Sequence, residues 1–230
     1  MLIKKWDELP QEFQTAEVKQ YYDILTKRTV ALMIKRSFDI LMSLLLLLIL
    51  SPIFLVIAVM IKAESEGPVF YRQKRITQYG KSFRIYKFRT MVVNADQLGT
   101  LVTLQGDDRI TKTGKHIRKC RLDELPQLIN VLKGEMTFVG TRPEVEKYVK
   151  AYSDAMKATL LLPAGITSLA SIRYKDEDEI LAKYSQNVDE AYIHIVLSEK
   201  MKYNLEYLIQ FSIWQDLKLC FLTIAAVLHK

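Results

Sequence analysis

Cysteine and histidine are scarce in this sequence of 230 residues. The two cysteines, Cys120 and Cys220, are far apart in the chain, so no disulfide framework is expected and a reducing compartment suits the protein. The three histidines are scattered, and no Cys/His cluster has the spacing of a zinc site. Disulfide scaffolds and zinc modules are therefore excluded as descriptions of this chain.

Charge is missing from one long stretch. From Ile40 through Ile61, 22 consecutive positions carry no charged side chain. A helix needs about 20 apolar residues to match the hydrocarbon core of a bilayer. The 39 residues before the stretch are rich in charge, so it begins too late to be a signal peptide. The sequence therefore predicts a membrane segment.

That segment is interrupted by Ser51-Pro52 near its centre. Proline removes a backbone donor and kinks a helix, and a neighbouring serine can bond to the freed groups in a bilayer. Both flanks are basic, and the positive-inside rule draws each of them to the cytoplasm. The flanking cations are Lys27, Arg28, Lys35 and Arg36 before the segment and Lys62, Arg72, Lys74 and Arg75 after it. Two interpretations stay open: a re-entrant hairpin that enters and leaves by one face, and a kinked spanning helix.

The whole chain carries 33 basic and 26 acidic side chains, a net charge of +7. Such a balance suits anionic partners, namely nucleic acid, acidic lipid head groups or a phosphorylated substrate. No helix-turn-helix, zinc-finger or RNA-recognition pattern is found, so we expect no nucleic-acid partner. With a membrane segment present, the lipid bilayer and a phosphate-bearing substrate are the expected partners.

The remaining pattern predicts an α+β fold, mainly helical with a small β element, in addition to the membrane hairpin. Residues 1–34 are expected to form an N-terminal surface helical segment, 35–62 the membrane helix broken at Ser51-Pro52, and 63–230 the basic, soluble-type domain that follows. Residues 69–91 are typical of two short strands around Tyr79-Gly80, and 163–165 of a turn. Residues 219–228 are apolar but too short to span a membrane, which predicts a core or interfacial helix.

The segment Asp123-Glu124-Leu125-Pro126-Gln127 opens an amphipathic helix. The helix is predicted from Leu125, Leu128, Ile129 and Leu132, with Gly134 as its stop. Asp123 is a suitable N-cap, and a helix N-terminus attracts phosphate. Adjacent carboxylates can act as nucleophile and Mg²⁺ ligand, although simple capping is the commoner role of an isolated Asp-Glu pair. The same five letters occur at residues 7–11, where no comparable helix face follows, and we interpret that copy as coincidence.

Cations surround the second copy of this pentapeptide in sequence. Lys115, Arg118, Lys119 and Arg121 precede it, and Arg142 follows the helix. Residues 83–89 alternate like a strand that places Lys87 and Arg89 on one face. Paired cations suit a diphosphate, whose transfer depends on positioning and charge neutralisation. Each cation taken alone is equally well explained as a solvated surface charge.

Taken together, these segments resemble the bacterial sugar transferases that act as monotopic phosphoglycosyl transferases. The resemblance runs from about Lys35 to the C-terminus. It rests on Lys35-Arg36-Ser37-Phe38-Asp39, Ser51-Pro52, Gly67-Pro68-Val69-Phe70, Tyr86 to Met91, Asp108 to Thr111, Leu122 to Gln127, Asn130 to Gly134 and Val139 to Pro143. One departure is Thr141, which stands where the family usually has the first proline of a Pro-Arg-Pro triplet, and it bears on sugar specificity rather than reaction type.

The resemblance implies a mechanism and a place in the cell. Asp123 would attack the sugar-linked phosphate of a UDP-sugar, Glu124 would hold Mg²⁺, and a polyprenol (undecaprenyl) phosphate would then take the phosphosugar. Substrate-binding positions would be Lys87, Arg89, Arg118, Arg142 and Arg173. The implied membrane segment is re-entrant, with the catalytic domain on the cytoplasmic face of the bacterial inner (plasma) membrane. Such transfer starts exopolysaccharide, capsule, O-antigen or glycoprotein glycan synthesis.

Other functions stay open at the level of sequence. A non-catalytic membrane scaffold could use the same basic face for acidic lipids or partner enzymes, and a nucleic-acid binder at the membrane is the weakest alternative. The sequence names neither the sugar nor the oligomeric state, and a homodimer is one state that it allows.

Overall fold

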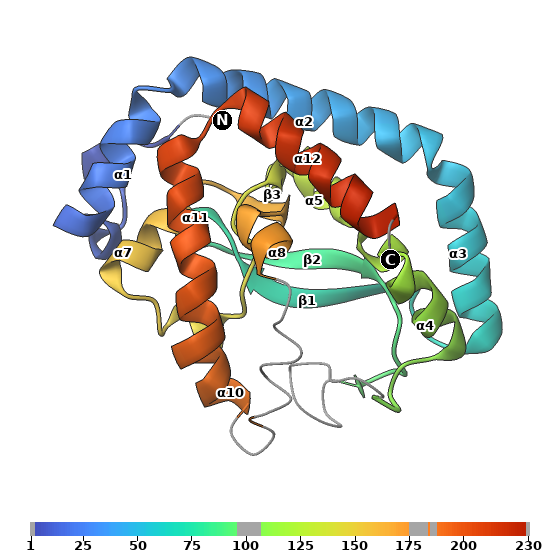
Figure 1. Ribbon diagram of the computed structural model, residues 1–230. Helices are drawn as coiled ribbons and strands as arrows, with labels where there is room; N and C mark the ends of the chain where they lie inside the picture. The colour runs from blue at the N-terminus through green and yellow to red at the C-terminus, as the bar shows by residue number, and fades with distance from the viewer. Residues whose placement is uncertain (1–2, 96–106, 175–183, 185–187, 229–230) are drawn as a thin grey trace.

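The computed structural model describes residues 3–95, 107–174, 184 and 188–228. Helices dominate (Figure 1). The longer ones are α1 (Ala16–Thr26), α2 (Thr29–Ile49), α3 (Ser51–Glu64), α4 (Lys112–Lys119), α5 (Gln127–Lys133), α11 (Ser198–Gln210) and α12 (Ile213–Leu228). The short ones are α6 (Glu146–Val149), α7 (Asp154–Lys157), α8 (Leu169–Arg173) and α10 (Val188–Ala191), and a π-helical turn, Tyr192–Leu197, joins α10 to α11. The predicted α+β class is confirmed.

Two pairs of strands make up the β structure. β1 (Phe70–Ile76) and β2 (Ser82–Phe88) form an antiparallel hairpin, as the pattern around Tyr79-Gly80 predicts. The turn contains Tyr79 at φ 57° and Gly80 at φ 71°, left-handed values that glycine adopts easily. β3 (Met136–Val139) and β4 (Ala164–Thr167) pair in parallel. The predicted turn at residues 163–165 is therefore wrong at Ala164 and Gly165, because pairing with a distant strand overrides the local preference for a turn.

One large apolar core joins the two ends of the chain. Leu25, Leu32, Leu161 and Met201 are among its fully buried members. The N-terminal segment contributes several of them, so one face of it packs into the core. The boundaries predicted for the membrane segment and the catalytic domain stay predictions. In the structure one continuous helix, α2, crosses the boundary at residue 35.

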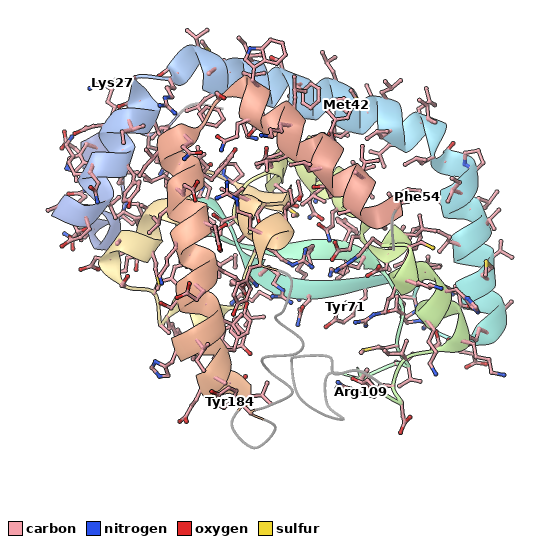
Figure 2. All side chains as sticks on the ribbon, viewed as in Figure 1. Lys27, Met42, Phe54, Tyr71, Arg109 and Tyr184 are labelled. Carbon is pink, nitrogen blue, oxygen red and sulfur yellow. The ribbon has the colours of Figure 1, made fainter. Side chains whose placement is uncertain are left out.

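Helix α2 buries mostly polar side chains and exposes most of its apolar ones. Its buried residues are Leu32, Lys35, Asp39 and Ser43, spaced as one face of a helix, and three of these four are polar. Its apolar residues face outward: Leu41, Leu44 and Leu48 are each more than half exposed. Figure 2 shows the side chains along the outer side of α2, near Met42, standing clear of the other elements. An exposed apolar surface of this extent needs a membrane or another protein to cover it.

The apolar surface continues past a break at Leu50. In the described part of the chain, no one helix has both the length and the apolar composition to cross a membrane. Helices α2 and α3 meet these criteria only as a pair, and the pair is bent by 61°. Pro52 lies at the start of α3, where its missing N–H removes no helical hydrogen bond, and the Ser51 hydroxyl donates to the Leu48 carbonyl at 2.8 Å. The predicted break at Ser51-Pro52 is confirmed, whereas insertion into a membrane stays a prediction.

Helix α12 is longer than the predicted apolar segment of residues 219–228 and lies along α2 (Figure 1). The two helices are joined by a buried ion pair, in which Lys35 Nζ lies 2.5 Å from Asp216 Oδ2. Lys35 Nζ also donates to the Val139 carbonyl of β3 at 2.8 Å, and Asp39 accepts from the Thr137 hydroxyl at 2.8 Å. These bonds fasten the bent helix pair α2–α3 to the sheet and the C-terminal helix.

Candidate active site

Asp123 lies in a turn between two helices. The 3₁₀ turn Leu122–Glu124 follows α4 and precedes α5, and Arg121 enters it at φ 56°. The predicted N-cap role of Asp123 is wrong, because α5 begins at Gln127 with Pro126 as its cap, four residues further on. The predicted stop is confirmed: Gly134 ends α5 at φ 83°. The Asp123 carboxylate is therefore not used as a helix cap.

The Asp123 side chain is buried, with 9% of its residue surface exposed. Its Oδ1 atom has no hydrogen-bond partner within the described part of the chain. Burial raises the pKa of Asp123, and the negative charge of Glu124 raises it further, while the charges of Lys87, Arg118 and Arg121 act in the opposite direction. A buried acceptor without a donor costs about 1–3 kcal/mol in a stable fold. Such an atom is typical of a group kept ready for a ligand.

Glu124 is held differently from its neighbour. Lys87 Nζ donates to Glu124 Oε1 at 2.9 Å, and Arg142 Nη2 donates to the same oxygen at 2.6 Å. Burial alone would raise the pKa of Glu124, but the charges and hydrogen bonds of Arg142 and Lys87 outweigh it and hold the pKa well below the usual range. Two adjacent carboxyl groups thus have opposite pKa shifts, which is typical of paired groups with separate chemical roles.

Asn130 of α5 holds β2, the strand that carries Lys87, next to the turn that carries Asp123. Its amide oxygen accepts from the Tyr86 N–H at 2.8 Å, and its Nδ2 donates to the Arg84 carbonyl at 3.1 Å. One fully buried side chain of α5 therefore pairs with the open edge of β2. Burial lowers the pKa of Lys87, while Glu124 acts to raise it. Local sequence patterns do not indicate this contact, because Asn130 lies 44 and 46 positions after the strand residues that it bonds.

The structure brings together three of the five predicted substrate-binding cations. Lys87 and Arg142 contact Glu124, and the charge of the half-buried Arg118 on α4 acts on Asp123. Arg89 is buried elsewhere, where its guanidinium donates to the Ser65 and Glu66 carbonyls at 2.8 and 2.6 Å. Arg173, at the end of α8, forms an exposed ion pair with Glu206 at 3.1 Å. Among the described residues, the contacts of Arg89 and Arg173 do not include Asp123 or Glu124.

Sequence reasoning missed two buried polar side chains near the site. The amide of Gln127, one turn beyond Asp123, is 1% exposed, and neither its oxygen nor its nitrogen has a partner in the described residues. The hydroxyl of Thr141, next to Arg142, is likewise buried and unpaired there. Only the departure from the usual proline at Thr141 marked it in the sequence. Nothing in the sequence showed that the Gln127 amide would be buried.

The described part of the chain does not form a metal site from protein side chains alone. The described residues contain no group of three or more His, Cys, Asp or Glu side chains that could hold a metal ion. Mg²⁺ is often bound through one or two carboxylates together with substrate phosphates. The adjacent carboxylates of Asp123 and Glu124 fit that smaller donor set.

Comparison with known proteins places the chain in a family. Residues 30–230 match the bacterial sugar transferase family, and the chain belongs to it. It is 37% identical over 198 residues to an Aeromonas hydrophila protein named UDP-N-acetylgalactosamine-undecaprenyl-phosphate N-acetylgalactosaminephosphotransferase, covering 85% of this chain and 44% of that protein. It is also 37% identical to a UDP-glucose:undecaprenyl-phosphate glucose-1-phosphate transferase of Klebsiella pneumoniae, covering 85% of this chain and 40% of that one.

A third relative is similar over most of its length. The exopolysaccharide production protein ExoY of Rhizobium meliloti is 34% identical over 215 residues, which cover 87% of this chain and 88% of that protein. The chain spans less than half the length of the first two relatives. The predicted family is therefore confirmed.

Proposed function

We propose that this protein transfers a phosphosugar from a UDP-sugar to a polyprenol (undecaprenyl) phosphate. The observation that carries the proposal is the pair of adjacent carboxylates with different environments. Asp123 is buried with an unpaired oxygen, and Glu124 beside it is neutralised by Lys87 and Arg142. The names of the relatives, which describe this class of reaction for those proteins, support it.

The proposed reaction has two displacements at one phosphorus. A carboxylate oxygen of Asp123 attacks the sugar-linked phosphorus of the UDP-sugar, and the bond from that phosphorus to the bridging oxygen breaks. UMP leaves with the bonding electrons, and an aspartyl-phosphosugar is formed. A phosphate oxygen of the polyprenol phosphate then attacks the same phosphorus, and the Asp123 carboxylate is released unchanged. The raised pKa of Asp123 means that the ionised nucleophile is lost at a higher pH than for an ordinary aspartate.

Lys87, Arg118 and Arg142 are the proposed phosphate-binding cations, because their charges converge on the two carboxylates. Transfer of a phosphoryl group depends mainly on positioning and charge neutralisation, which fixed cations supply. Substrate contacts of Arg89 and Arg173 stay predictions, and the present partners of both side chains suit a structural role. Glu124 is the proposed Mg²⁺ ligand, where the ion would neutralise charge on the diphosphate.

We further propose that the bent helix pair α2–α3 enters the cytoplasmic leaflet of the bacterial inner membrane and returns to the same face. Its exposed apolar side chains, its bend and its basic flanks support this placement. The site would then lie where a soluble sugar nucleotide and a lipid phosphate can meet. The exposed Trp214 and Phe221 of α12 suit an interfacial helix beside it. Cysteines placed at positions 30 and 66 should be labelled from the same side of the membrane, and labelling from opposite sides would restore a spanning helix.

The duplicated pentapeptide supplies a matched control for the reaction. Purified protein in lipid nanodiscs is given a panel of UDP-sugars, a short polyprenol phosphate and Mg²⁺, and UMP release is measured. Asp123→Asn should abolish release, whereas Asp7→Asn, at an exposed position with the same neighbours in sequence, should retain it. Equal loss in both variants, or full activity in Asp123→Asn, would overturn the assignment. No release by the wild-type protein from any UDP-sugar would favour a scaffold. Mass measurement of the same nanodiscs tests the homodimer.

A further inference from the structure

The second half of the bent helix pair packs directly against the segment that leads to Asp123. Ile57 and Ile61 of α3 form a small apolar cluster with Ile117 of α4 and Phe88 of β2, and each is at most 4% exposed. Leu122, the residue immediately before Asp123, packs against the same cluster. Figure 1 shows α3 descending beside α4. The packing of α3 therefore extends to the turn that holds the proposed nucleophile.

A polar contact reinforces this packing at the end of α3. The last residue of the helix, Glu64, accepts the Lys112 N–H at 2.7 Å with Oε1 and the Thr113 N–H at 2.9 Å with Oε2. The hydroxyl of Thr111 accepts the next N–H, that of Gly114, at 3.0 Å. The leading N–H groups of a helix have no partner within it, so this carboxylate supplements the local cap of Thr111 with one from 48 residues earlier. A negative charge also stabilises a helix N-terminus.

The chain that leaves α3 is fixed as well. Arg89, just beyond β2, donates to the carbonyls of Ser65 and Glu66 and to the Ser65 hydroxyl at 2.9 Å. Gly67 makes room for it: at φ +113°, a Cβ on this residue would stand 2.2 Å from Arg89 Nη1. Gly114 likewise lets α4 approach the segment that follows β2, because a Cβ there would stand 2.1 Å from the Thr90 carbonyl oxygen. Residues 64 and 65 are thus held at a defined place on the catalytic domain.

We propose that Glu64 is a positioning residue for the reaction, acting through α4 on Arg118 and Asp123. The inference rests on the proposed function. Glu64 fixes the start of α4, and Arg118 lies in the last turn of that helix. Asp123 follows four positions after Lys119, the last residue of α4. The position of the bent helix pair on the catalytic domain thereby sets the distance between Arg118 and the Asp123 carboxylate. The site is fully assembled only when α3 is in place.

The test compares two neighbouring glutamates. Glu64→Gln removes the charge and leaves one oxygen for two N–H donors, while Glu64→Asp keeps the charge on a shorter side chain. Glu66→Gln is the matched control, because the Glu66 side chain is exposed and makes no hydrogen bond or ion pair with the described residues. UMP release is measured in nanodiscs as kcat and KM for the UDP-sugar, over a range of pH. Thermal unfolding is recorded for each variant.

We expect Glu64→Gln to lower kcat about ten- to a hundredfold, the scale of a 1 Å misplacement, while KM changes less. The acid limb of its pH profile should move to higher pH, because Arg118 no longer lowers the pKa of Asp123 as strongly. Glu64→Asp should recover part of both effects. Thr111→Val removes the other cap of α4 and should shift the acid limb in the same direction. This variant replaces Glu64→Gln in the test if Glu64→Gln does not fold.

A Glu64→Gln enzyme that matches Glu66→Gln in kcat and in its acid limb would overturn the positioning role. So would a loss of thermal stability without a shift of the acid limb. Either result leaves the proposed function intact, because that function is decided by Asp123→Asn and by UMP release from the wild-type protein.

Discussion

Replacing Gln127 by methionine should make the protein more stable and less active. The amide is 1% exposed, and its oxygen and nitrogen both lack partners in the described residues. Each buried polar group without a partner costs about 1–3 kcal/mol, and methionine fills a similar volume without either group. After allowance for imperfect packing, we expect the free energy of unfolding to rise by roughly 1–3 kcal/mol. For a chain of this length that raises Tm by about 2–10 °C.

The assay is thermal unfolding in nanodiscs, followed by circular dichroism, with UMP release measured on the same samples. Gln78→Met is the control, because the Gln78 amide donates to the Leu161 carbonyl at 2.9 Å and its removal should lower Tm. Activity of Gln127→Met should fall because Gln127 begins α5, four positions after Asp123, and a change in its packing displaces the turn that holds the proposed nucleophile. If both variants lower Tm equally, the Gln127 amide has a partner in solution and the reasoning fails.

Three further outcomes are expected. In Arg142→Met, Glu124 loses a cation. Since the folded pKa of Glu124 lies below its ordinary value of 4.5, its ion pairs stabilise the fold above that pH and the benefit is lost as pH falls through the folded pKa. Arg142→Met should therefore have a lower Tm than the wild type at neutral pH, and the difference should shrink as pH falls below 4.5 toward the folded pKa of Glu124. In Arg118→Gln, the pKa of Asp123 should rise further, which moves the acid limb of kcat/KM to higher pH, and an unchanged limb would contradict the proximity of these charges. Gly114→Ala should lower Tm, because its Cβ would stand 2.1 Å from a backbone carbonyl oxygen, and an unchanged Tm would show that α4 can move away freely.

The two copies of Asp-Glu-Leu-Pro-Gln show what local sequence determines. Each copy contributes its first two residues to a 3₁₀ turn, Trp6–Glu8 in one case and Leu122–Glu124 in the other. Local chemistry therefore fixes the turn. Asp7 is exposed, whereas Asp123 is buried beside a glutamate that distant cations neutralise. The difference between the copies comes from residues brought in by the tertiary fold.

Other features also separate into those set by local sequence and those set by the tertiary fold. The hairpin of β1 and β2 and the end of α5 at Gly134 follow from short-range patterns and were predictable. The parallel pairing of β4 with β3 was not, because it joins strands separated by several short helices. The burial of Lys35 and Asp39 also escaped prediction, since the partners of both lie more than 90 positions away. Resemblance to the family supplied Lys87 and Arg142, but it could not show that Arg89 binds the backbone after α3.

The bend between α2 and α3 limits how deeply the protein can reach into a bilayer. In the proposed placement with both arms equally inclined, a bend of 61° tilts each arm by about 30° from the membrane plane. Ile40–Ile49 and Ser51–Ile61 are each about 15 Å long, so they descend only about 8 Å. The hydrocarbon core is about 30 Å thick, and the tip stays within the upper half of one leaflet. The protein would thus add area to the cytoplasmic leaflet alone and act as a shallow wedge, which favours membrane that curves toward the cytoplasm.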